Sequence, residues 1–238
     1  MRIDWKSASV ARRPHKRGQK KKVHYLAPAG GQLTAYESRL EASAGAAFGL
    51  DPRVVSARTQ PMTFDLATGR RFPTKEDLFQ WVRDSGSRPI IYTPDFELQL
   101  QTGSILVEVK HAELIARAPK VLAYPSILAR YGYRLVILDD RVLHDAFVRN
   151  MRSLTMAWTY SPNRSEITNL QADSSDWVSL GALRDRGYPD ALVLGCLARG
   201  HLTCDVQRER ISKNTLIRTV VDKPSHLMEL PLDACRTS

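Results

Sequence analysis

The chain has 238 residues, of which 43% are hydrophobic and 25% are charged, a composition typical of folded globular proteins. Its apolar runs all fall short of the roughly 18 residues that a membrane-spanning helix needs. The N-terminal segment lacks the apolar middle of a secretory signal, and three cysteines cannot all pair with one another. These features exclude an integral membrane protein, and we expect a reduced, cytoplasmic chain with no membrane partner.

Positive charge is concentrated at the N-terminus. The formal net charge is +10, and residues 1–22 contain nine Lys and Arg against one acidic residue, whereas the rest of the chain is nearly neutral. A segment so rich in charge and poor in large apolar residues can neutralise a phosphate backbone but cannot form a core. We predict a basic flexible arm over residues 1–31 that binds nucleic acid; a solubilising or protein-binding tail is the alternative.

Helical and strand patterns alternate after this arm. Thr34 and Glu37 have the spacing of a capping box, which indicates a helix start. We predict a helix over 35–48, strands over 54–57 and 62–66, a helix over 75–84, strands over 90–100 and 105–110 joined by a turn, helical structure near 113–131 interrupted by Pro119 and Pro125, and a strand over 133–138. This order predicts an α/β fold.

The C-terminal part follows a different pattern. Helical spacing resumes after residue 140, and residues 160–176 are polar and rich in serine. Two short helices over 177–186 and 190–199, followed by a strand over 201–206, predict a helix-turn-helix with a wing. We therefore expect one domain over residues 32–150 and a second over 151–238.

Three residues of the predicted hairpin carry a candidate chemistry. Alternate residues of a strand share a face, so Glu108 and Lys110 are presented together, and an antiparallel neighbour places Asp95 beside Glu108. Two adjacent carboxylates repel each other unless a cation lies between them, and oxygen ligands suit Mg²⁺, with Mn²⁺ as an alternative. Such an ion activates water against a phosphodiester, and Lys110 offsets the developing charge.

An ordinary cross-strand charge pair would explain Glu108 and Lys110 equally well if they stood alone. The Pro94-Asp95 pair across the hairpin and an upstream helix that carries carboxylates favour the metal site. The arrangement resembles the PD-(D/E)xK nuclease superfamily over about residues 35–140. The resemblance implies a restriction-endonuclease-like core, with a mixed sheet flanked by helices.

Further segments narrow this resemblance. They are Ser38-Arg39-Leu40-Glu41, Asp51-Pro52-Arg53-Val54-Val55, Gln60-Pro61, Tyr92-Thr93-Pro94-Asp95-Phe96 and Glu108-Val109-Lys110. Together they are similar to the TnsA family of transposon-end endonucleases. The resemblance implies that Glu41, Asp95 and Glu108 bind the metal, that Lys110 completes the catalytic site, and that the Val109 carbonyl is an extra ligand.

One assignment in this set has a competitor. Glu37 lies on the same predicted helix as Glu41, but Glu37 fits the capping box and Glu41 fits the Ser-Arg-Leu-Glu motif, so Glu41 is preferred. Gln60-Pro61 is interpreted as a structural match that borders the site. His111 is left out because neighbouring strand residues face opposite ways.

The resemblance also implies a function. We expect a Mg²⁺-dependent endonuclease that cuts the 5′ strands at transposon ends in double-stranded DNA. Its expected partners are a transposase of the integrase type and an ATPase regulator, and its expected C-terminal domain is winged-helix-like and mainly α. The alternatives are a restriction- or repair-type nuclease of the same superfamily and a catalytically inactive DNA-binding adaptor.

A second group of metal-type residues is set aside. Cys196, His201 and Cys204 fit no strong zinc spacing and lack a fourth ligand. We expect the two cysteines to be ordinary core or near-surface thiols.

Overall fold

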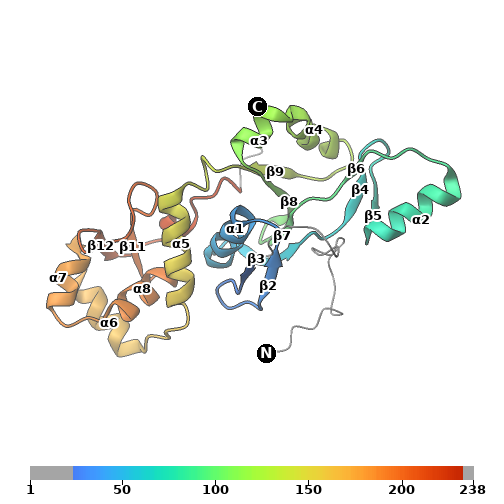
Figure 1. Ribbon diagram of the computed structural model, residues 1–238. Coiled ribbons are helices and arrows are strands. Elements are labelled where there is room, and N and C mark those ends of the chain that lie inside the picture. Colours follow the sequence, from blue (N-terminus) through green and yellow to red (C-terminus); the bar gives the residue numbers. More distant parts are fainter. Residues whose placement is uncertain (1–23, 233–238) are drawn as a thin grey trace. The chain divides into compact units, whose positions relative to one another are not determined.

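The computed structural model describes residues 24–232 (Figure 1). Within that range, no helix combines the length and the apolar character needed to cross a bilayer. The described chain divides into two compact units, one formed by residues 55–139 and the other by residues 24–54 together with 140–232. Each unit is described by itself.

A four-stranded mixed sheet is the centre of the first unit. Its order is β3 (Val54–Thr59), β7 (Phe96–Leu100), β8 (Gly103–Val109) and β9 (Leu135–Leu138). β7 and β8 are antiparallel, and β8 and β9 are parallel, so the predicted mixed α/β character is confirmed. A two-residue turn joins β7 to β8, and Gly103 at φ +134° follows it in a conformation that only glycine adopts readily.

A second, smaller sheet has the order β5-β4-β6 and comprises β4 (Thr63–Asp65), β5 (Arg70–Phe72) and β6 (Ile91–Tyr92). The single strand predicted over 90–100 is therefore wrong, because β6 pairs with β4 whereas β7 pairs with β8. Pro94 lies between them, and it has no N–H to continue a ladder. The helix predicted over 75–84 is confirmed as α2 (Lys75–Ser85).

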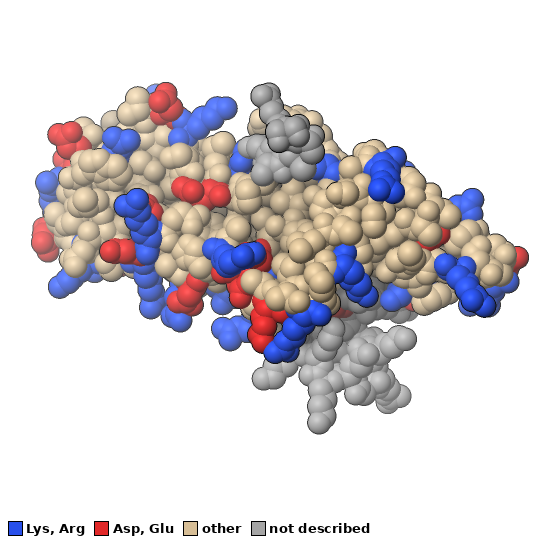
Figure 2. Space-filling view, turned by 90° about the horizontal axis from the view of Figure 1, so that it is seen from above, with Lys and Arg blue, Asp and Glu red and all other residues tan. Residues whose placement is uncertain are grey.

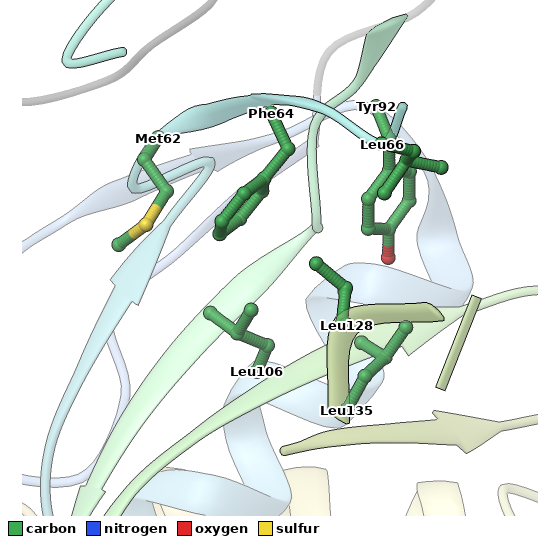
Figure 3. Packing of buried hydrophobic residues seen from close by; sticks show 7 residues of the cluster. All are labelled: Met62, Phe64, Leu66, Tyr92, Leu106, Leu128 and Leu135. Atoms are coloured by element: carbon green, nitrogen blue, oxygen red, sulfur yellow. The ribbon is translucent and has the colours of Figure 1, made fainter. Parts of the chain in front are cut away.

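An apolar cluster packs between the two sheets of this unit (Figure 3). It joins side chains of β4 and the residues on either side of it, β6, β8, α4 (Tyr124–Ala129) and β9: Met62, Phe64, Leu66, Tyr92, Leu106, Leu128 and Leu135. The opposite face of the hairpin is also buried: β7 contributes Phe96 and Leu98 to it, and β8 contributes Ile105 and Val107. The hairpin β7–β8 is thus held on both faces.

Two prolines divide the helical segment of this unit as predicted. α3 (Ala112–Arg117) ends before Pro119, which opens the short 3₁₀ helix η1 (Pro119–Ala123). Pro125 lies in the first turn of α4, where its missing N–H removes no intrahelical bond.

The second unit begins with a hairpin of β1 (His24–Leu26) and β2 (Thr34–Tyr36), followed by α1 (Arg39–Leu50). The capping box predicted at Thr34 and Glu37 is wrong, because Thr34 belongs to a strand. Ser38 caps the helix instead: its Oγ accepts from the Glu41 N–H at 3.1 Å, and Glu41 Oε2 accepts from the Glu37 N–H at 3.0 Å. The helix therefore begins four residues later than predicted, and Ser38 is its N-cap.

The remainder of this unit is mainly helical. It comprises α5 (Asp145–Ala157), α6 (Arg164–Asp173), β10 (Val178–Ser179), α7 (Leu180–Asp185), α8 (Asp190–Ala198), β11 (Leu202–Cys204), β12 (Leu216–Thr219) and η2 (Ser225–Leu227). α1 packs on α5, and α5 on α8. The predicted order of helix, turn, helix and strand is confirmed, although α7 starts only at Leu180 because β10 pairs with β12.

Side-chain hydrogen bonds tie the two sequence segments of the second unit together. Arg53 binds the buried Asp51 carboxylate, with Nη2 and Oδ2 2.7 Å apart, and donates to the carbonyls of Met228 and Leu230. Arg152 donates to Ser43 Oγ at 2.8 Å. Residues 24–54 are therefore anchored on the C-terminal segment.

Candidate active site

Strand register brings Asp95 and Glu108 together. In the hairpin, Phe96 lies opposite Val107, so the same register places Asp95 opposite Glu108 at the end of β7. Opposite residues in an antiparallel pair have side chains on the same face. Asp95 Oδ2 also accepts from the Val109 N–H at 2.8 Å, which fixes this carboxylate against the end of β8. The predicted antiparallel hairpin is confirmed, and its register is the one that presents Asp95 beside Glu108.

The Glu108 carboxylate lies in a nearly closed environment. Only 9% of the residue is exposed, and Tyr92 donates its hydroxyl hydrogen to Glu108 Oε2 at 2.9 Å. Burial, and after it the charge of Glu108, raises the pKa of Tyr92 well above its ordinary value of 10.0. Tyr92 therefore stays protonated and keeps its role as a donor to this carboxylate.

A second tyrosine, Tyr124, packs against Tyr92 near the Glu108 carboxylate. The rings of Tyr92 and Tyr124 lie 4.7 Å apart between centroids, tilted by 53°. Burial and the charge of Glu108 raise the pKa of Tyr124 too, so this phenol also remains neutral. Figure 3 shows the Tyr92 ring within the apolar cluster, with its hydroxyl at the end remote from the backbone. The core of the unit thus holds the donor that fixes Glu108.

Lys110 follows at the end of β8, on the face of Glu108. Its Nζ lies 3.9 Å from Glu108 Oε1, and its side chain is 32% exposed. The Lys110 N–H donates to the Leu138 carbonyl of β9 at 3.0 Å, which fixes the backbone. An ammonium group next to one carboxylate and open to solvent can approach an anionic substrate, as the predicted catalytic role requires.

Glu41 belongs to the second unit, and its Oε2 accepts a hydrogen bond from the Glu37 N–H at 3.0 Å, just before α1 begins. The preference for Glu41 over Glu37 rested partly on a capping box of Thr34 and Glu37, and that reason is wrong, because Ser38 is the residue that caps α1. The role of Glu41 as a metal ligand stays a prediction.

The carboxylates of Asp95 and Glu108 suit a hard divalent cation. Among residues 24–232, no group of three or more His, Cys, Asp and Glu side chains is arranged to hold a metal ion. Mg²⁺ commonly takes only one or two carboxylates and fills its remaining positions with water and substrate phosphate. Two carboxylates would suffice for Mg²⁺ or Mn²⁺ on this basis, and the metal roles of Asp95, Glu108 and the Val109 carbonyl stay predictions.

Sequence reasoning gave no role to Tyr92, although it lies only three residues before Asp95. A tyrosine on a short strand pattern is usual in a core, and nothing local indicates that its hydroxyl reaches Glu108. A separate hydroxyl pair, Thr63 Oγ1 and Thr93 Oγ1 at 2.8 Å, ties β4 to the segment that leads into Asp95. These contacts depend on the pairing of β4 with β6, which the sequence pattern did not predict.

The two cysteines of the group that fits no zinc spacing lie in the core, whereas His201 is only partly buried. Cys196 and Cys204 are free and buried, which confirms the prediction. Burial raises the pKa of Cys196 to about 11 and that of Cys204 to about 12, so both remain protonated thiols near neutral pH.

Positive and negative side chains are interspersed on the surface of the described residues. Figure 2 shows Lys and Arg side chains scattered among Asp and Glu over the face in view. The predicted basic segment of residues 1–22 lies outside the described residues.

Comparison with known proteins gives no identification: no family model matches the chain, and no curated protein matches it.

Proposed function

We propose that this chain is a divalent-metal-dependent DNA endonuclease similar to the TnsA family, with a restriction-endonuclease-like core and a winged-helix-like C-terminal domain. The observation that carries the proposal is the placement of Asp95 opposite Glu108, with the Lys110 ammonium 3.9 Å from Glu108. Two hard carboxylates next to one amine match the needs of phosphodiester hydrolysis. The resemblance supplies the substrate, the 5′ strands at transposon ends.

Each residue has a separate task in this proposal. Asp95 and Glu108 would hold Mg²⁺, which would polarise the scissile phosphate and lower the pKa of a bound water. Tyr92 keeps the Glu108 carboxylate in one orientation by donating to Oε2. Lys110 offsets the negative charge that develops on the phosphate oxygens. The basic N-terminal segment would bind the DNA backbone in a salt-sensitive way.

The proposed partners are those that the resemblance to the TnsA family implies. They are a transposase of the integrase type, which would cut the 3′ strands, and an ATPase regulator, which would license the cut. We expect weak cleavage by the isolated chain and strong cleavage in the presence of both partners.

The test uses labelled duplex DNA with transposon ends, the full chain, and both partners in Mg²⁺. We expect Asp95→Asn and Lys110→Ala each to reduce 5′-strand cleavage by at least about 100-fold. Glu113→Gln and Lys120→Ala are matched controls on exposed positions of α3 and η1, and they should cleave normally. Undiminished cleavage by Asp95→Asn would contradict the site. Efficient cutting of plasmid DNA without partners would favour a restriction-type nuclease, and intact DNA binding without a metal effect would favour an adaptor.

A further inference from the structure

Gln60 directly follows β3, and its backbone and its side chain each have a feature that destabilises the fold. Its φ is +44°, and among the described residues it is the one non-glycine with a positive φ. Its side chain is also buried, with 6% of the residue exposed, and within residues 24–232 its Oε1 has no hydrogen-bond partner. Left-handed backbone and a buried unpaired oxygen each destabilise a fold.

The position of Gln60 is defined by its pairing with β7. The Gln60 N–H donates to the Asp95 carbonyl at 2.8 Å, and Arg58, two residues earlier, forms an ion pair with Glu97, two residues later. Both pairs fit one antiparallel register between the neighbouring strands β3 and β7. Gln60 is therefore the cross-strand neighbour of Asp95.

The register between β3 and β7 adds a residue next to β3 to the candidate site. Asp95 has Glu108 opposite it on β8 and Gln60 opposite it on β3, so the three residues occupy one row across the sheet. The row contains two carboxylates and one carboxamide. Strained backbone and unpaired buried polar groups concentrate at functional sites, where a ligand compensates for them.

We propose that Gln60 is a positioning residue for a divalent cation at Asp95 and Glu108, and that its carboxamide oxygen accepts a hydrogen bond from a water molecule of that cation. The inference rests on the proposed function and adds a third side chain to its site. A glycine would fit the backbone of position 60 with less strain, but it could not offer this oxygen.

The inference makes opposite predictions for stability and for cation binding. Met has nearly the shape of Gln and no oxygen, so Gln60→Met removes the buried unpaired group with little change in packing. We expect its melting temperature without metal to rise by about 2–4 °C. We expect its apparent affinity for Mn²⁺ to fall by about 10-fold, as is usual when a group that orients a metal's ligands is lost.

The measurement is the thermal melting of the full chain across a Mn²⁺ titration, because a ligand that binds only the folded state raises the melting temperature. Gln99→Met is the matched control. It makes the same chemical change on the face of β7 that carries Asp95, but away from the row, and it should leave the Mn²⁺ response unchanged. Gln60→Glu retains an oxygen and should restore the Mn²⁺ response while lowering stability without metal, because it adds a third carboxylate to the row.

The outcomes separate this inference from the proposed function. A Mn²⁺ response that Asp95→Asn abolishes and Gln60→Met leaves intact overturns the role of Gln60 alone. A Gln60→Met chain that melts at a lower temperature than the wild type and binds Mn²⁺ equally well assigns Gln60 a purely structural part. A wild-type chain whose melting temperature does not respond to Mn²⁺ overturns both the proposed function and the inference.

Discussion

Removal of the Tyr92 hydroxyl tests whether the core of the first unit fixes the Glu108 carboxylate. Tyr92→Phe keeps the ring in the apolar cluster and deletes only the donor that lies 2.9 Å from Glu108 Oε2. Because Glu108 is 9% exposed, water has little access with which to replace the lost hydrogen bond. The variant therefore leaves a buried carboxylate with one donor fewer.

The expected cost follows from the charge of the acceptor. A hydrogen bond to a charged group contributes about 1.5–3 kcal/mol, against about 0.5–1.5 kcal/mol for a neutral pair. Tyr92→Phe should lower the free energy of unfolding by the first amount in the wild type and by the second in a Glu108→Gln background. The double-mutant cycle should therefore give a coupling of about 1 kcal/mol or more.

The assay is denaturant unfolding of the four chains at pH 7 and again at alkaline pH. The pKa of Tyr92 is raised in the folded state, so its stabilising contribution is complete below pH 10 and is lost as the pH rises further, where the unfolded chain releases the proton and the folded chain keeps it. Tyr92→Phe should remove this part of the alkaline decline. Tyr133→Phe, in the same cluster, is the control and should show no coupling to Glu108→Gln. A coupling near zero for Tyr92 would refute the reasoning.

Two further predictions concern stability, one in each unit. Gly69 has φ +72°, and a Cβ there would lie 2.2 Å from Tyr131 Cδ1, so Gly69→Ala should cost about 2–4 kcal/mol in urea unfolding. Gly86→Ala, at φ +65° in open space, should cost only about 1 kcal/mol, and equal costs for the two would contradict the clash. Burial lowers the pKa of His226 from 6.5 to about 4, so its neutral form is favoured in the folded state. The resulting stability is complete above pH 6.5 and is lost as the pH falls toward 4, by about 3 kcal/mol; His226→Gln should flatten the pH profile of unfolding, and an unchanged profile would contradict a buried neutral histidine.

The hairpin of the first unit could be predicted because its signals are local. The alternation of side chains along residues 105–110 and the short turn before them fix the face of Glu108, and Asp95 follows from the same register. The division of residues 90–100 into two strands was not predicted. It depends on the pairing of Tyr92 with Phe64, 28 positions earlier in the chain, which no periodicity of the segment encodes.

Two features of the second unit were obscured by the sequence. Thr34 and Ser38 each precede a glutamate by three residues, so the sequence offers two caps, and the pairing of β2 with β1 selects the later one. α6 carries only one buried residue, Leu170, and therefore lacks an apolar stripe. The capping box of Asn163 and Glu166 is the signal that could have indicated this helix.

The difference between local signals and the pairing of distant strands also explains which part of the candidate site could be predicted from the sequence. Asp95, Glu108 and Lys110 lie on one hairpin, so the period of two along its strands is enough to bring them to one face. Gln60 directly follows β3 and lies 35 positions before Asp95 in the chain. The resemblance marked Gln60-Pro61 only as a structural match that borders the site, and the pairing of Gln60 with Asp95 exists only in the folded sheet. Its backbone conformation and its unpaired oxygen have no counterpart in composition or spacing. When a site is built across a sheet, the residues on one hairpin can be predicted from the alternation of side chains along its strands. A residue on a distant strand is found only from the strand register in the folded structure. For Gln60, the strained backbone and the buried unpaired oxygen then single it out.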